Sequence, residues 1–137
     1  DQVYAPGTVI VTSAGEVSDI RKTVSPALKH QKSQIVYVDF AQDGFQLGGS
    51  SFGQIVGRIG GDVPTVTDTE YFKNAFAAVQ QLIDEGKVLA GHDVSAGGLI
   101  TALLETTFAD NTSGMNLSLD ALDETDTVKV LLSEKPA

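Results

Sequence analysis

The sequence predicts an α/β fold in which helices pack on a mixed β-sheet. Short runs of β-branched and apolar residues indicate strands, and longer stretches with apolar residues three or four positions apart indicate amphipathic helices. The expected order is strand, strand, helix, helix, strand, helix, strand, strand. Because this order alternates too irregularly for a doubly wound sheet, we expect an α/β sandwich instead.

The first two strands are expected at residues 7–14 and 34–40. Residues 7–14 (GTVIVTSA) are rich in β-branched side chains, and 34–40 (QIVYVDF) is a nearly continuous apolar run, typical of strands covered on both faces. Pro26 interrupts the mixed segment between them. Residues 15–33 are therefore expected to form a loop with a helical turn or an extended edge piece.

Two helices are expected next. Apolar residues at positions 52, 55, 56 and 59 share one helical face, and the glycines at 60 and 61 should end this helix. The second helix is the clearest element, because Asp68 or Thr69 can cap its start and Gly86 should stop it. Its apolar stripe consists of Tyr71, Phe72, Ala75, Phe76, Val79, Leu82 and Ile83.

The rest of the chain should contain three strands and one more helix. We expect a short strand at 88–91, an amphipathic helix over 99–108, a half-exposed strand at 115–119 and a final strand at 128–132. The acidic residues 120–127 should form a loop or a short helix.

Composition argues against several classes of function. The 137 residues suffice for one domain with a buried core. Eighteen acidic against nine basic residues give a net charge of -9, which disfavours nucleic acids and anionic membranes as partners. The absence of cysteine excludes disulfides, thiolate zinc sites, iron–sulfur clusters and a cysteine nucleophile. The absence of cysteine also fits a cytoplasmic protein, and no long apolar run or leader-like segment is visible. Both ends of the chain suggest a piece of a longer protein.

The turn at residues 91–98 (GHDVSAGG) is the best candidate for a site. Asp93 is expected at the end of a strand and Ser95 at the N-cap of the next helix, while Gly97 and Gly98 would let the backbone pass close to a ligand. A helix N-terminus favours a phosphate, and a nearby carboxylate can hold Mg²⁺ that bridges to it. The pattern suggests Asp93 for metal and Ser95 for a nucleotide phosphate. The spacing alone favours a structural interpretation, in which both residues cap the helix and the glycines serve helix–sheet packing.

Three other features have both a functional and a structural interpretation. His92 could act as an acid or base, but a packed histidine bonded to the backbone is the simpler interpretation, and His30 is expected on the surface. Residues 48–51 (GGSS) lack the lysine of a Walker loop, and they could cradle an anion or form a serine-capped helix entry. Arg21 and Lys22 could contact a phosphate or a partner, although a solvated surface pair is simpler.

Two motifs carry a resemblance to a known family. Residues 46–54 (QLGGSSFGQ) and 91–99 (GHDVSAGGL) resemble the C-terminal-type domain of the aminoimidazole ribonucleotide (AIR) synthetase superfamily. The segment from 5–8 through 19–23 and residues 38–40 fit as well, so the resemblance spans nearly the whole chain and implies one domain over residues 1–137. Within the superfamily, the sequence is most similar to the second such domain of the phosphoribosylformylglycinamidine synthases.

The resemblance implies part of a purine-biosynthesis ligase that converts formylglycinamide ribonucleotide, glutamine and ATP to the amidine. It implies that Asp93 binds Mg²⁺ and that Ser95 contacts ATP or ADP, with Gly97 and Gly98 beside the nucleotide. The implied partners are an upstream ATP-binding domain, with the remaining metal carboxylates, and a downstream glutaminase domain of the same chain. Ala96 stands where some relatives carry an acidic residue. No catalytic residue is implied within this chain, so the 137 residues alone are expected to fold but to catalyse nothing.

Two alternatives stay open at this point. The domain could be a structural module that holds a non-catalytic nucleotide or only docks neighbouring domains. It could also belong to a related enzyme, such as AIR synthetase or selenophosphate synthetase. Nucleotide exchange would separate a catalytic from a structural site.

Overall fold

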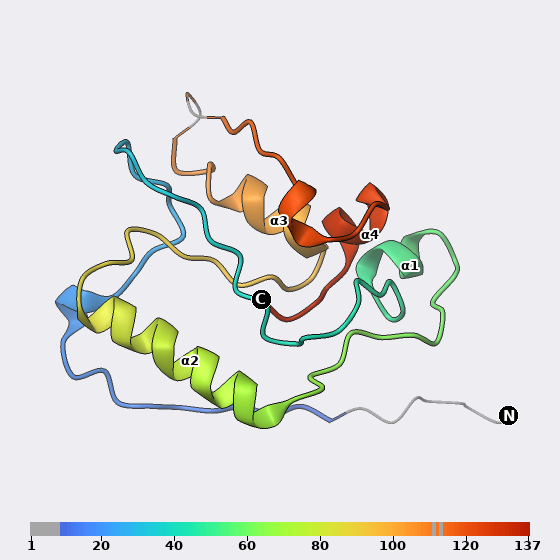
Figure 1. The fold of residues 1–137 in the computed structure, drawn as a ribbon, viewed down its shortest axis with the longest axis horizontal. Coiled ribbons are helices and arrows are strands. Elements are labelled where there is room, and N and C mark those ends of the chain that lie inside the picture. Colours follow the sequence, from blue (N-terminus) through green and yellow to red (C-terminus); the bar gives the residue numbers. More distant parts are fainter. Residues whose placement is uncertain (1–8, 111, 113) are drawn as a thin grey trace, which may run out of the picture.

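The computed structural model describes residues 9–110, 112 and 114–137, and every regular element within these ranges is helical (Figure 1). The α-helices there are α1 (Ser51–Ile55), α2 (Thr69–Asp84), α3 (Gly98–Glu105) and α4 (Thr127–Leu132). The connecting segments contain two 3-10 helices, η1 (Ile20–Lys22) and η2 (Asp120–Leu122), as expected for a helical turn in 15–33 and a short helix in 120–127. None of these helices has the length and apolar character needed to cross a membrane.

The predicted mixed β-sheet is wrong, because the described residues contain no strand. Segments that were expected to pair as strands meet other parts of the chain at isolated points. Phe40 N donates to Pro136 O at 3.1 Å, and Gly91 N donates to Ser25 O at 3.1 Å. A sheet requires a partner held in register over several residues, and the apolar pattern of one segment carries no information about that partner.

The first predicted strand is only partly covered by the structure. Residues 9–14 carry no regular secondary structure, and Val9, Ile10 and Val11 remain 84–87% exposed. Residues 5–8, which include the start of this strand and contribute to the family resemblance, lie outside the described residues. These exposed β-branched side chains do not pack against another part of the chain, so their preference for strands has no effect here.

The C-terminal segment, residues 133–137, connects parts of the chain that are far apart in sequence. In the ribbon, the C-terminus lies among the other elements and not at the edge (Figure 1). Ser133 Oγ donates to Gln46 O at 2.7 Å, and Lys135 Nζ contacts Asp39 Oδ2 at 2.7 Å. This segment thus ties the region before α1 to the end of α4.

The predicted start and end of the second helix are confirmed. Asp68 is the N-cap of α2, and its Oδ1 accepts hydrogen bonds from Glu70 N at 3.0 Å and Tyr71 N at 2.9 Å. The helix ends at Asp84, two residues before Gly86. Capping and periodicity act within a few residues, which is why they are visible in the sequence.

The helix predicted to reach position 59 is shorter in the structure. α1 ends at Ile55, and Arg58 N folds back to donate to Gly53 O at 2.8 Å. Ile59 already belongs to the next segment, where its carbonyl accepts a hydrogen bond from Gly49 N at 2.8 Å. Contacts of the glycine-rich loop with this returning segment therefore replace the last helical turn.

Residues 128–132 form a helix and not the predicted final strand. Asp126 caps α4, with Oδ1 accepting hydrogen bonds from Val128 N at 3.0 Å and Lys129 N at 3.4 Å. Val130 is 1% exposed and belongs to the core. The cap and this burial outweigh the preference of the valines for strands, which is weak and depends on context.

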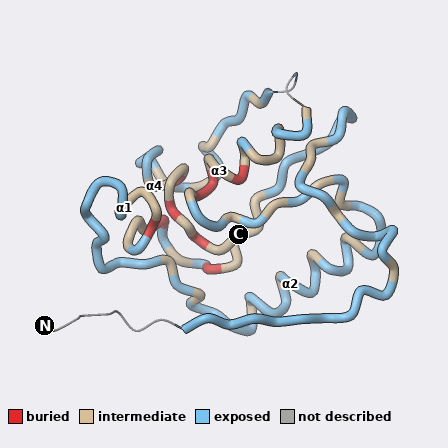
Figure 2. Tube along the Cα trace, turned by 180° about the vertical axis from the view of Figure 1, so that it is seen from behind, coloured by how far each residue is buried: buried red, intermediate tan, exposed pale blue. Residues whose placement is uncertain are grey.

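The core lies on one side of the molecule. Buried positions gather around α1, α3, α4 and the C-terminal segment, whereas α2 has no buried residue (Figure 2). The core cluster consists of Phe45, Leu99 and Val130, and the partly buried side chains packed against it are Tyr37, Val94, Leu103, Leu119 and Leu122. The turn that precedes α3 is therefore anchored at the best-packed part of the chain.

Candidate functional site

The turn at residues 91–98 leads directly into α3, and both polar candidates on it are accessible. The Asp93 side chain is 79% exposed, and Ser95 is exposed as well. The predicted N-cap role of Ser95 is wrong: Gly97 is the N-cap, with a φ of 89°, and no side chain caps α3. This φ favours glycine at the N-cap position, and the Ser95 hydroxyl makes no cap hydrogen bond.

The backbone of Gly97 and Gly98 is closely surrounded. A Cβ atom at Gly98 would lie 2.7 Å from Leu131 O, so only glycine lets α3 start this close to α4. Gly97 N donates to Glu134 Oε1 at 2.9 Å, and Gly98 N donates to Ser95 O at 3.0 Å. Both amides, expected beside a nucleotide, thus already donate to oxygens of the chain.

His92 fixes the backbone of the turn against α3. Its ring Nδ1 lies 2.7 Å from Asp93 O, and its Nε2 lies 2.9 Å from Glu105 Oε2. The side chain is only 18% exposed, so His92 matches the packed, backbone-bonded histidine of the structural interpretation. His30 is exposed as expected, and its Nε2 lies 2.6 Å from Asp110 Oδ2.

The glycine–serine motif at 48–51 lies next to the same turn. Ser50 caps α1, because its Oγ accepts a hydrogen bond from Gly53 N at 3.1 Å, as the serine-capped interpretation expected. Ser51 N donates to Glu134 Oε1 at 2.8 Å. Since the same oxygen also binds Gly97, one carboxylate brings together the two motifs that the sequence singled out.

Asp93 fits a metal as a single ligand and not as a complete site. Among the described residues, no group of three or more His, Cys, Asp or Glu side chains could hold a metal ion. Mg²⁺ prefers six oxygens and is commonly bound through one or two carboxylates together with phosphates and water. An exposed Asp93 can supply one such oxygen to a site that other groups complete.

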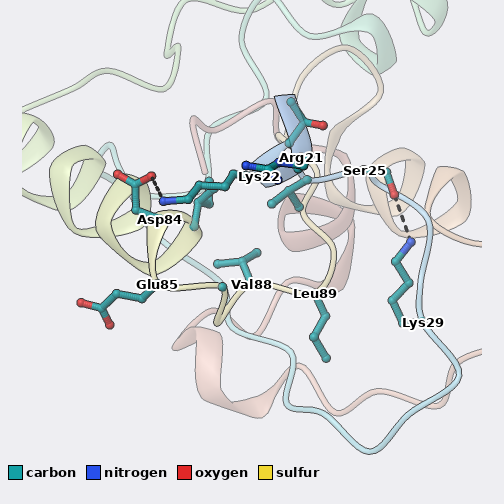
Figure 3. Close-up of a pocket in the computed structure, with 12 residues that line it drawn as sticks. Arg21, Lys22, Ser25, Lys29, Asp84, Glu85, Val88 and Leu89 are labelled. Carbon is teal, nitrogen blue, oxygen red and sulfur yellow. Dashed lines mark hydrogen bonds and ion pairs between the residues drawn. The ribbon is translucent and has the colours of Figure 1, made fainter. Parts of the chain in front are cut away.

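The basic pair Arg21 and Lys22 lines a cavity of about 360 Å³ beside the end of α2 (Figure 3). Asp19 holds Arg21 through two hydrogen bonds of 2.9 Å, and Lys22 Nζ lies 3.2 Å from Asp84 Oδ1. The hydrogen bonds to Arg21 hold the pKa of the Asp19 carboxyl below its ordinary value. Because carboxylates of the chain already pair with both cations, the surface-pair interpretation is the better one.

Comparison with known proteins places the chain in a family. Residues 35–136 match the family described as AIR synthase related protein, C-terminal domain. The chain belongs to this family. It is 44% identical, over 119 residues and 85% of its length, to the probable phosphoribosylformylglycinamidine synthase, chloroplastic/mitochondrial, of Arabidopsis thaliana. The match covers 8% of that protein, so this AIR synthase related domain spans a small part of its relative's length.

Two charged groups of this AIR synthase related domain were not predicted from the sequence. Glu134 binds amides that lie 37 and 83 residues away, and Lys135 pairs with Asp39 across 96 residues. Lys135 is 4% exposed, and its Nζ lies 4.6 Å from the centre of the Phe45 ring. No local pattern marks these contacts, because every partner comes from a distant segment. The sequence signal was limited to the adjacent charges of Glu134 and Lys135, which follow the apolar run 130–132.

Proposed function

We propose that this chain is a domain of an ATP-dependent ligase that converts formylglycinamide ribonucleotide, glutamine and ATP to formylglycinamidine ribonucleotide. The family match over residues 35–136 and the 44% identity to a probable phosphoribosylformylglycinamidine synthase support this assignment. In this proposal, an ATP-binding domain and a glutaminase domain elsewhere in the same protein supply the rest of the active site. No residue of this chain is assigned to proton transfer or nucleophilic attack.

The domain contributes one wall of a magnesium–nucleotide site. Asp93 supplies a carboxylate ligand to Mg²⁺, Ser95 supplies a hydroxyl to the nucleotide, and Gly97 and Gly98 keep the turn narrow beside it. Support comes from the exposure of Asp93 and Ser95 on a turn whose backbone is fixed on both sides. Bound Mg²⁺ would neutralise charge on the phosphates, the usual contribution of a metal in phosphoryl transfer.

Asp93→Asn in the full-length protein tests this assignment. The substitution keeps the shape of the side chain but removes the charge of one metal ligand. It should raise the dissociation constant of Mg-ADP at least about tenfold, equal to about 1.4 kcal/mol of binding free energy. Isothermal titration at fixed Mg²⁺ measures this constant. Asp123→Asn is the matched control, because it removes one charge from an exposed aspartate whose φ of 52° asparagine tolerates.

Equal dissociation constants for Asp93→Asn and the wild type would contradict the metal role.

A second measurement separates a catalytic site from a structural one. A catalytic site exchanges its nucleotide during turnover, whereas a structural module retains ADP through purification and dialysis. Retained nucleotide that fails to exchange with labelled ADP would favour the structural alternative.

A further inference from the structure

The Glu134 carboxylate joins the two glycine-rich turns of the domain. Its Oε1 accepts one hydrogen bond from Ser51 N at 2.8 Å and one from Gly97 N at 2.9 Å. Ser51 is the first residue of α1, and Gly97 is the N-cap of α3. A single oxygen atom therefore connects the entries of two helices.

The carboxylate is well suited to this connection. Burial is the largest single influence and raises the pKa of Glu134, but the hydrogen bonds from Gly97 and Ser51 together outweigh it and leave the pKa below the ordinary value. The group is therefore charged at neutral pH. Hydrogen bonds from backbone amides to a charged acceptor are shorter and stronger than those between neutral groups.

The backbone on both sides of Glu134 is fixed as well. Ser133 and Lys135 are buried, and each makes a side-chain hydrogen bond of 2.7 Å to a distant segment. Pro136 O accepts a hydrogen bond from Phe40 N at 3.1 Å. The carboxylate thus starts from a rigid segment and not from a loose terminus.

The same C-terminal segment binds the turn at two points. Val94 N donates to Ala137 O at 3.0 Å, and Gly97 N donates to Glu134 Oε1 at 2.9 Å. Asp93 directly precedes the first point, and Ser95 lies between the two. The Glu134 side chain therefore connects the end of the turn to the glycine–serine motif at 48–51.

We propose that Glu134 is a positioning residue, which holds the 93–97 turn in the geometry that the magnesium–nucleotide site needs. This inference rests on the proposed roles of Asp93 and Ser95. Because the Gly97 amide donates to Glu134, the proposed polar contact with the nucleotide is made by the Ser95 hydroxyl and not by this amide. Glu134 acts through the turn and does not touch the nucleotide.

Substitutions of Glu134 in the full-length protein test the proposal. Glu134→Ala removes the acceptor and should raise the dissociation constant of Mg-ADP at least about tenfold. Glu134→Gln keeps a carbonyl acceptor without the charge and should raise it by a smaller factor. Glu16→Ala, which removes an exposed glutamate, is the control and should leave the constant unchanged. Hydrogen exchange at the amides of Ser51 and Gly97 should accelerate in Glu134→Ala and stay slow in the control.

A double-mutant cycle separates positioning from a general loss of stability. If Glu134 acts through the turn, Glu134→Ala should weaken Mg-ADP binding much less in an Asp93→Asn background than in the wild type. Equal factors in both backgrounds would overturn the positioning role. Tighter binding of Mg-ADP by Glu134→Ala would also overturn it, because that result means that the carboxylate competes with phosphate for Gly97.

The cycle also distinguishes failure of this inference from failure of the proposed function. Weak binding by Asp93→Asn together with normal binding by Glu134→Ala would reject Glu134 alone. Normal binding by Asp93→Asn and by Ser95→Ala would reject the proposed site, and the Glu134 proposal with it. In that case, faster exchange at Gly97 in Glu134→Ala would still report the structural link.

Discussion

At the scale of single residues, Tyr37 is the clearest case of an imperfect fit. Its ring packs against Phe45, with ring centres 6.3 Å apart. Its hydroxyl is the buried side-chain polar group that lacks a hydrogen-bond partner among the described residues. A buried polar group without a partner loses its bonds to water and gains nothing in return.

Tyr37→Phe should therefore raise the free energy of unfolding by about 1 kcal/mol, because it removes the unpartnered hydroxyl and keeps the ring contact. Chemical denaturation monitored by circular dichroism measures the change. Tyr71→Phe on α2 is the control and should have little effect. Destabilisation by Tyr37→Phe would mean that the hydroxyl has a partner.

Ionisation of Tyr37 should lower the stability of the protein at alkaline pH. Burial, and secondarily the charge of Asp39, raise the pKa of Tyr37 to about 12 in the folded protein. The ordinary tyrosine pKa is about 10. Because the folded pKa is raised, the neutral form of Tyr37 is favoured in the folded protein. The free energy of unfolding is therefore unaffected by this group below about pH 10, and it falls as the pH rises through about 12. Tyr37→Phe should remove this loss, as denaturation series at several pH values would show.

Lys135 shows how the chain accommodates a buried charge. The side chain is 4% exposed, and its ammonium pairs with Asp39 at 2.7 Å. The ammonium also lies over the Phe45 ring, 4.6 Å from the ring centre. Asp39 is in turn fixed by hydrogen bonds from Ala41 N and Gln42 N at 3.1 and 3.0 Å. The pair is thus specific in geometry, although burying the ammonium offsets part of its attraction to the partly exposed Asp39 carboxylate.

At the scale of elements, α4 depends on a single cap. α4 has only six residues, too few for a stable helix without tertiary contacts and capping. Asp126 satisfies the amides of Val128 and Lys129 at its start. This cap, together with burial of Val130 against α3, overrides the strand preference of residues 128–132.

Asp126→Ala should lower the free energy of unfolding by about 1 kcal/mol, the usual effect of losing an N-cap side chain. Thr125→Ala, at the exposed neighbouring position, should have a much smaller effect. Urea denaturation of both variants and the wild type provides the comparison. Equal stability of Asp126→Ala and the wild type would show that packing alone forms α4.

At the scale of the whole molecule, the chain exposes an unusually large surface. Its accessible area is 10317 Å², whereas a compact monomer of 14.4 kDa exposes about 6,800 Å². Apolar side chains such as Val36 and Ile55 are 73% and 85% exposed. Burial on folding is therefore small, and it is concentrated around Phe45, Leu99 and Val130.

The 137-residue chain by itself should bind Mg-ATP more weakly than micromolar. Asp93 offers one carboxylate, and no cluster of three ligands exists in the part of the chain that the structure describes. One ligand from the protein leaves most of the octahedron of Mg²⁺ to water. Isothermal titration of the chain with Mg-ATP checks this expectation. Micromolar affinity that Asp93→Asn leaves unchanged would point to a different site.

Local signals predicted several features correctly. The Asp68 cap and the stop near Gly86 depend on residues a few positions apart, and so does the serine cap of α1, which was one of two open interpretations of residues 48–51. The two motifs at 46–54 and 91–99 indicated the family, which the match over residues 35–136 confirms. The helix after the second motif was expected over 99–108, but α3 ends three residues earlier, at Glu105, and its N-cap is Gly97 and not Ser95. Such features are visible because the interacting groups are neighbours in the chain.

Features that depend on contacts between distant segments could not be predicted from the sequence. Whether an apolar segment pairs into a sheet depends on its partner, so residues 34–40 and 128–132 took forms that their own composition did not indicate. Glu134 reaches Ser51 and Gly97 only because folding brings together segments 83 and 37 residues apart. Hydrogen bonds require proximity in space, and amino-acid order specifies that proximity only through the packing of the whole chain.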